Sequence, residues 1–143
     1  MKNSDREQYV NDLWELHHLG GLTISEYATF MARDCATAFY AGADLATLLT
    51  ACSTVETYLR SEGNSAKSYS TFNDLIDQSG LSVELISDLH EIRKYRNRWV
   101  HVNEPDNDII LLDQPELVEA EIEKFAILAL KSMVRTLCSN QWV

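Results

Sequence analysis

The sequence is poor in residues that interrupt helices and poor in positive charge. It holds two prolines, both after position 104, and five glycines. The first hundred residues therefore contain no proline that would break a helix, so long helices are permitted there. Lysine and arginine number 12 against 22 acidic residues, which gives a formal net charge of −10. This charge disfavours broad binding to DNA or to an anionic membrane, and any nucleic-acid contact would have to be local.

Disulfide patterns and long apolar runs are also missing. Cys35, Cys52 and Cys138 are odd in number and form no CxxC pair, which favours a reducing cytoplasm. The first ten residues lack the apolar stretch of a signal peptide, and no run approaches the roughly 18 residues of a membrane span. No glycine-rich phosphate loop or metal-ligand cluster occurs. We expect one cytoplasmic domain over residues 1–143 that lies outside membranes and uses no cofactor and no metal.

Helix start and stop signals indicate an all-α fold. Ser4 with Glu7, and Thr23 with Glu26, match the capping box, in which residues three apart satisfy amides at a helix start. Ser82 is placed to cap a further helix. The resulting fold class is a single-domain helical bundle of five to six helices. The predicted helices cover residues of about 5–18, 24–42, 44–63, 72–80, 82–101 and 115–137.

Two stretches are expected to lie outside these helices. The segment GNSAKSYS, residues 63–70, has the composition of a loop. Ile109–Leu112 could form a brief extended piece, after which Asp113 is a candidate cap for a helix with Pro115 in its first turn. The acidic side chains between 104 and 123 could hold Ca²⁺ or Mg²⁺. They lack the spacing of an EF-hand loop, so we favour a solvated face or a contact with a basic surface.

The fifth predicted helix carries an arginine inside its apolar stripe. At about 100° per residue, Leu85, Leu89, Ile92 and Val100 fall on one face, with Arg96 in its middle. A guanidinium is almost never fully buried without a partner. Arg96 must therefore snorkel to water, pair with a glutamate of the third or last helix, or meet a cleft, a second protein surface or a ligand.

Arg96 and His101 cannot converge within one straight helix, because they lie about 140° apart. Asn97 and His101 are four apart and share a face. Arg96 and His101 would meet if the helix bent or ended near Trp99, or if two copies of the helix met across a two-fold axis. A symmetric dimer is the simpler solution.

The same helix concentrates basic charge. Arg93, Lys94, Arg96 and Arg98 lie within six positions and are candidates for binding an anionic substrate. An arginine holds phosphate by a planar fork of donors, and a histidine moves protons near neutral pH. Together Arg96 and His101 suit metal-independent cleavage of RNA, in which the ribose 2′-hydroxyl attacks its own phosphate.

The stretch Arg96-Asn97-Arg98-Trp99-Val100-His101 resembles the R-N-x-x-x-H motif of HEPN (higher eukaryote and prokaryote nucleotide-binding) domains. The segments FYAGADLATLLTACSTVETYLRSEG and FNDLIDQSGLSVELISDLHEIRKYRNRWVH resemble the family's glutamate-bearing helix and the approach to its motif helix. The resemblance runs from about residue 24 to the last helix and is most specific over 89–101.

This resemblance implies a helical bundle that dimerises with its two motifs side by side. It also implies membership of a family that includes metal-independent endoribonucleases of toxin, restriction and antiviral systems. On that analogy Arg96 and His101 are the catalytic pair, Asn97 positions or hydrogen-bonds, and Glu56 is a supporting carboxylate.

One departure from the family bears on the partner. In the branch paired with a nucleotidyltransferase antitoxin the motif continues His-x-Tyr, whereas Asn103 stands at that place here. This departure favours a branch linked to restriction or phage defence over the nucleotidyltransferase-paired one. The partner implied by the resemblance is an antitoxin or a component of a defence system. The family also contains members that only bind or dimerise, so the alternative is a non-catalytic module for a partner protein or a nucleotide.

Overall fold

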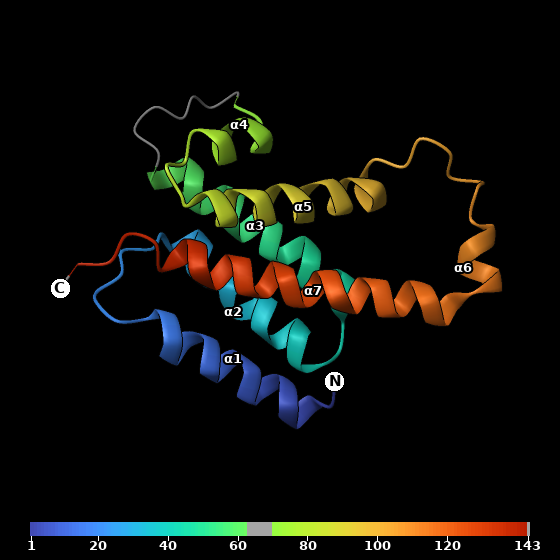
Figure 1. Cartoon of the computed structure of the whole chain (residues 1–143), viewed down its shortest axis with the longest axis horizontal. Coiled ribbons are helices and arrows are strands. Elements are labelled where there is room, and N and C mark those ends of the chain that lie inside the picture. The colour runs from blue at the N-terminus through green and yellow to red at the C-terminus, as the bar shows by residue number, and fades with distance from the viewer. Residues whose placement is uncertain (63–69, 143) are drawn as a thin grey trace.

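The computed structural model describes residues 1–62 and 70–142, and within these residues seven helices form (Figure 1). The all-α prediction is confirmed. Residues 63–69 of the predicted loop GNSAKSYS lie outside the described residues. The helices are α1 (Asn3–His17), α2 (Glu26–Tyr40), α3 (Asp44–Glu62), α4 (Phe72–Asp77), α5 (Val83–Val100), α6 (Ile109–Asp113) and α7 (Pro115–Leu137).

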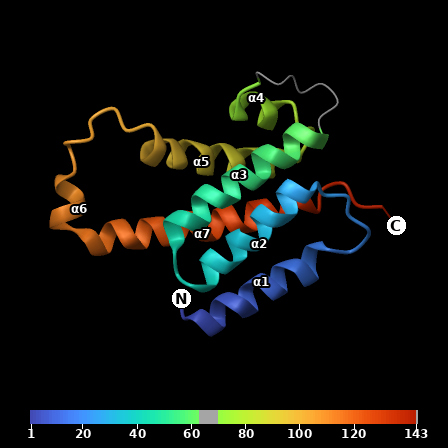
Figure 2. The ribbon, with the colours of Figure 1, turned by 180° about the vertical axis from the view of Figure 1, so that it is seen from behind.

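The two longest helices, α3 and α7, pack against each other in the middle of the bundle (Figures 1 and 2). Helix α2 lies along α3, and α1 closes the same side against α2 and α7. Helix α5 lies on the other side against α7, α3 and α4. Helix α6 stands at one end and contacts α7 alone among the helices of the described chain.

One hydrophobic core joins these helices. Leu48 and Val55 of α3, Leu89 of α5 and Leu130 of α7 are fully buried in it. All three cysteines are buried and free, as their apolar helical positions suggest. Among the described helices, none combines the length and the apolar character that crossing a membrane would require.

Serine side chains cap the starts of two helices, and one of these caps was predicted. Ser82 Oγ accepts a hydrogen bond from Leu85 N at 3.2 Å and begins α5. The start of α2 differs from the prediction in its residue, because the cap is Ser25 instead of Thr23. The predicted box at Ser4 is wrong, since α1 begins at Asn3 with no side-chain cap. Several Ser and Thr near a helix start compete for the same amides, and their local pattern does not decide between them.

The segment before α7 also differs from the prediction. Ile109–Leu112 are helical in α6 instead of extended, which raises the helix count from the expected five or six to seven. Pro115 begins α7 as expected, but its N-cap is Gln114 without a side-chain hydrogen bond, so Asp113 is not the cap. Four apolar residues in a row carry no clear period, which is why strand and helix could not be separated there.

Two tertiary contacts hold the N-terminal helix. Arg6 is only 3% exposed, and its guanidinium donates to Asp44 Oδ1 at 2.6 Å and to Glu123 Oε2 at 3.2 Å. The connection after α1 pairs with the C-terminal segment, because Gly21 and Trp142 form an isolated β-bridge. These contacts tie α1 to α3, to α7 and to the end of the chain.

Candidate functional site

Helix α5 carries the motif and is positioned by its apolar stripe. It spans Val83–Val100, close to the predicted 82–101. Leu85, Leu89 and Ile92 are buried, as the stripe predicts, and hold the helix against the core. Arg96 continues this buried face, so its side chain is directed into the bundle instead of into water.

The side chain of Arg96 extends from α5 toward α3 and α4, and 18% of it is exposed. Its Nη2 donates to Asn97 Oδ1 at 2.9 Å, and its Nη1 lies 4.0 Å from Glu56 Oε1. The guanidinium carbon lies 5.3 Å from the centre of the Phe72 ring. Its Nε is buried and has no hydrogen-bond partner within residues 1–62 and 70–142. Arg96 is therefore enclosed by partners but incompletely satisfied by them.

Glu56 is shared between two arginines. Its Oε2 lies 3.6 Å from Arg60 Nη2, one turn later on α3, while its Oε1 faces Arg96. Among the alternatives for Arg96, the structure thus contains an ion pair with a glutamate of the third helix. The contact is long, and Glu56 is 31% exposed, so solvent weakens the attraction.

Cys52 lies one turn before Glu56 on α3 and is fully buried. Burial raises the pKa of its thiol to about 12, although nearby Arg96 lowers it. The thiol is therefore protonated at neutral pH and does not act as a nucleophile. Cys52 is a residue of the hydrophobic core.

His101 lies outside this cluster. Helix α5 ends at Val100, and His101 is its exposed C-cap with φ −125° and ψ 62°. Its backbone N donates to Asn97 O at 2.9 Å. In the described part of the chain no hydrogen bond or ion pair joins Arg96 with His101. The change of backbone direction at His101 makes the imidazole accessible to solvent or to a second molecule.

The other basic residues of the run face different surroundings. Arg93 Nε donates to His90 Nδ1 at 3.2 Å, and His90 Nε2 lies 2.7 Å from Asp77 Oδ1. Lys94 is exposed, and with Arg93 and His90 it borders a surface depression between α4 and α5. Arg98 is exposed and lies 3.4 Å from Glu121 of α7. The run is a set of separate positive positions instead of one continuous patch.

Two contributors to the site were missed in the sequence. Arg60 follows Glu56 by four residues, and this i, i+4 spacing was a readable signal for a shared carboxylate. Phe72 is the first residue of α4, and nothing in the sequence near it indicates that it lies beneath Arg96. That contact arises because α4 and α5 pack together after separate turns of the chain.

Chemically, a guanidinium donates hydrogen bonds to anionic oxygens such as those of a phosphate. Asn97 Oδ1 accepts one N–H of Arg96 and thereby orients the guanidinium. The described residues hold no group of three or more His, Cys, Asp or Glu side chains able to bind a metal. The acidic side chains at 104–113 are exposed, in line with a solvated face.

The structure brings Arg96, Asn97 and Glu56 together and leaves His101 at the adjacent end of the helix. The catalytic and substrate-binding roles of these residues stay predictions, as does the likeness of the bundle to HEPN domains. Comparison of the chain with models of protein families, with curated proteins and with solved structures found no match.

Proposed function

We propose that the protein is a cytoplasmic, metal-independent endoribonuclease of a defence or toxin-type system that acts as a dimer. The observation that carries the proposal is the state of Arg96, which is four-fifths buried yet leaves Nε without a partner in the described chain. His101 is exposed five residues later, at the end of the same helix. These features, together with the R-N-x-x-x-H resemblance, support one anion site and one proton-transfer group per chain.

The proposed reaction needs a base, an acid and stabilisation of charge. The ribose O2′ loses its proton to an imidazole and forms a bond to phosphorus, while the bond from phosphorus to O5′ breaks and O5′ gains a proton. The products are a 2′,3′-cyclic phosphate and a 5′-hydroxyl. In a dimer the two His101 side chains supply base and acid, and Arg96 stabilises the charge on the phosphoryl oxygens.

The test is cleavage of mixed RNA in the presence of EDTA. Wild type should produce cyclic-phosphate and 5′-hydroxyl ends, and His101→Ala should lose at least about a hundredfold in rate, because general acid–base catalysis contributes on that order. His18→Ala is the matched control, since His18 is also an exposed histidine just after a helix. The proposal would be contradicted if wild type and His101→Ala left equal amounts of intact RNA and if neither produced cyclic-phosphate and 5′-hydroxyl ends.

A second candidate is a non-catalytic binding module for a partner protein or a nucleotide. Its support is the internal engagement of Arg96 by Glu56 and Asn97, which gives the arginine a structural role, and the net charge of −10. The discriminating measurement is binding of a labelled nucleotide by wild type and Arg96→Ala. Binding that depends on Arg96, in a protein that leaves RNA intact, would favour this candidate, and RNA cleavage would exclude it.

A further inference from the structure

Residues 100–117 carry an unusual density of exposed aliphatic side chains. This segment, here called the arm, comprises the end of α5, the connection to α6, α6 itself and the first residues of α7. Their exposed fractions lie between 40% and 73%. Isolated exposed aliphatics are ordinary, but four in a row on one short helix are not. The exposed aliphatic residues of the arm are Val100, Val102, Ile109, Ile110, Leu111, Leu112 and Leu117.

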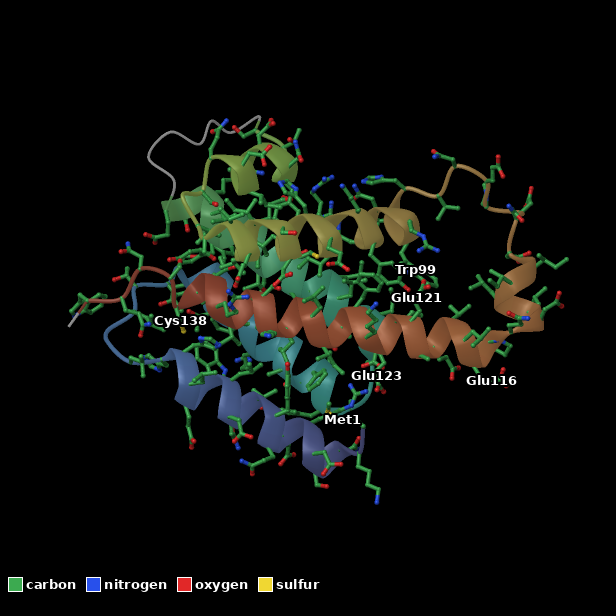
Figure 3. The ribbon with its side chains drawn as sticks, viewed as in Figure 1. Met1, Trp99, Glu116, Glu121, Glu123 and Cys138 are labelled. Atoms are coloured by element: carbon green, nitrogen blue, oxygen red, sulfur yellow. The ribbon has the colours of Figure 1, made fainter. Side chains whose placement is uncertain are left out.

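The arm stands apart from the core. Helix α6 has five residues and contacts only α7 among the described helices. Figure 3 places Glu116 near α6, at the end of α7 far from Cys138, and Figure 2 shows the same separation from behind. A helix this short gains little stability from its own hydrogen bonds and depends on packing. The arm therefore offers an apolar surface that the other described residues, 1–62 and 70–142, leave uncovered.

The size of this surface matches what a dimer requires. At about 32 Å² for each methylene, the exposed aliphatic atoms amount to roughly 500 Å² per chain. A standard interface buries about 800 Å² on each partner, of which roughly 65% is apolar in homodimers. The exposed apolar area of one arm is therefore about equal to the apolar area that one partner contributes to a standard homodimer interface.

Charge identifies where the arm docks. The arm holds five acidic residues and no lysine or arginine, whereas four of the chain's 12 lysines and arginines lie within 93–98 on α5. An acidic arm repels RNA and anionic lipid but complements this basic run. Lys94 and Arg98 are exposed there, and Arg98 also lies 3.4 Å from Glu121 of its own chain. The acidic residues of the arm are Glu104, Asp106, Asp108, Asp113 and Glu116.

We propose that the arm of each chain docks on the C-terminal half of α5 of a second copy, in a reciprocal two-fold exchange. The inference rests on the dimer of the proposed function and names the surface that forms it. His101 lies between Val100 and Val102 at the base of the arm, so the exchange places each His101 at the interface. Two-fold symmetry makes both contacts equivalent and closes the assembly at two chains.

The test measures molar mass by light scattering and the dimer dissociation constant by sedimentation, in the absence of RNA. Wild type should have the mass of two chains, and Leu112→Glu should raise the dissociation constant on the order of 30-fold or more. Leu16→Glu is the matched control, because Leu16 of α1 is 66% exposed and Leu112 is 73% exposed. Raising salt from about 0.05 M to about 0.5 M should also weaken the dimer, because it screens the charges.

Three outcomes would overturn the exchange: a monomeric wild type at concentrations far above micromolar, a dimer that Leu112→Glu leaves unchanged, or equal weakening by Leu16→Glu. Circular dichroism of each variant checks that the helices remain. A dimer lost in Leu112→Glu without any RNA cleavage by wild type would support the arm and contradict the ribonuclease. If the Leu112→Glu variant stays dimeric and cleaves RNA, the result would contradict the role of the arm and support the ribonuclease.

Discussion

Arg96 of α5 faces Glu56 of α3 with Nη1 4.0 Å from Oε1, so the first residue of the motif contacts a residue forty positions earlier in the chain. The contact joins a proposed catalytic residue to the core, which means that a loss of activity on mutation has two possible causes. Variants that separate stability from cleavage are therefore required.

The first prediction uses the shape of the guanidinium. Arg96→Lys keeps the positive charge near Glu56 but loses the planar fork and the stacking on Phe72. We expect a loss of about 1 kcal/mol or less in the free energy of unfolding, and at least about a tenfold loss in the rate of RNA cleavage. Urea unfolding and initial cleavage rates measure the two effects. Arg33→Lys of α2 is the control, because Arg33 also lies over a phenylalanine ring and beside a carboxylate but outside the motif helix. Equal cleavage by both variants would refute the role of Arg96.

The second prediction concerns the buried ion pair of α1. Arg6→Met removes a guanidinium that is 3% exposed and leaves Asp44 and Glu123 without their shared cation. Removing one partner of a buried pair leaves a charge that is poorly solvated, and Asp44 is only 16% exposed. Glu123 is 36% exposed and keeps the N-terminal ammonium at 3.3 Å, so we expect a loss of about 1 to 3 kcal/mol in the free energy of unfolding. Arg33→Met is the matched control, since the Arg33 side chain is 65% exposed and its pair with Asp34 lies in water. Similar unfolding free energies for the two variants would contradict the prediction.

The third prediction follows from the pKa of His17. Burial, reinforced by the charges of Arg135 and Lys131, lowers this pKa below its ordinary value of 6.5. Well above pH 6.5 the imidazole is neutral in both states, and its contribution to stability is constant. As the pH falls below 6.5, the unfolded chain takes up the proton first, so the folded state loses stability until it too is protonated.

His17→Gln should therefore reduce the loss of stability on acidification. The measurement is urea unfolding of wild type and variant at about pH 7.5 and about pH 5.5, on either side of the ordinary pKa. The difference between the two pH values isolates the titration from any change in packing. A variant that loses as much stability as wild type over this interval would show that His17 does not contribute.

The fourth prediction tests the contact between the α1–α2 connection and the end of the chain. A Cβ at Gly20 would overlap the backbone carbonyl oxygen of Trp142, which cannot move without breaking the bridge to Gly21. We expect Gly20→Ala to cost about 1 to 3 kcal/mol, as overpacking does.

Gly21→Ala is the control for this effect. Its Cβ would meet the side chain of Trp142, which is 57% exposed and can rotate away. Thermal unfolding should therefore show a larger decrease in Tm for Gly20→Ala than for Gly21→Ala. The opposite order would mean that the C-terminal segment does not pack as described.

Much of the fold followed from signals that act over three or four residues. The spacing of Leu85, Leu89 and Ile92 and the cap at Ser82 predicted α5 to within one residue at each end. The same spacing placed Arg96 in the apolar stripe and required a partner for it. Local signals were insufficient at Ser4 and over Ile109–Leu112, where neighbouring caps compete or where the apolar run has no period.

The sequence by itself determined an all-α chain, the position of the motif helix and the need of Arg96 for a partner. Helix periodicity depends on residues three and four apart, and a guanidinium on an apolar stripe requires a partner wherever that stripe is buried. Only the tertiary structure decided that this partner is Glu56 with Phe72 beneath, that His101 lies outside the cluster, and that α6 is left exposed. These relations depend on how helices distant in the chain cross and where each one ends, and such long-range packing is set by the whole core.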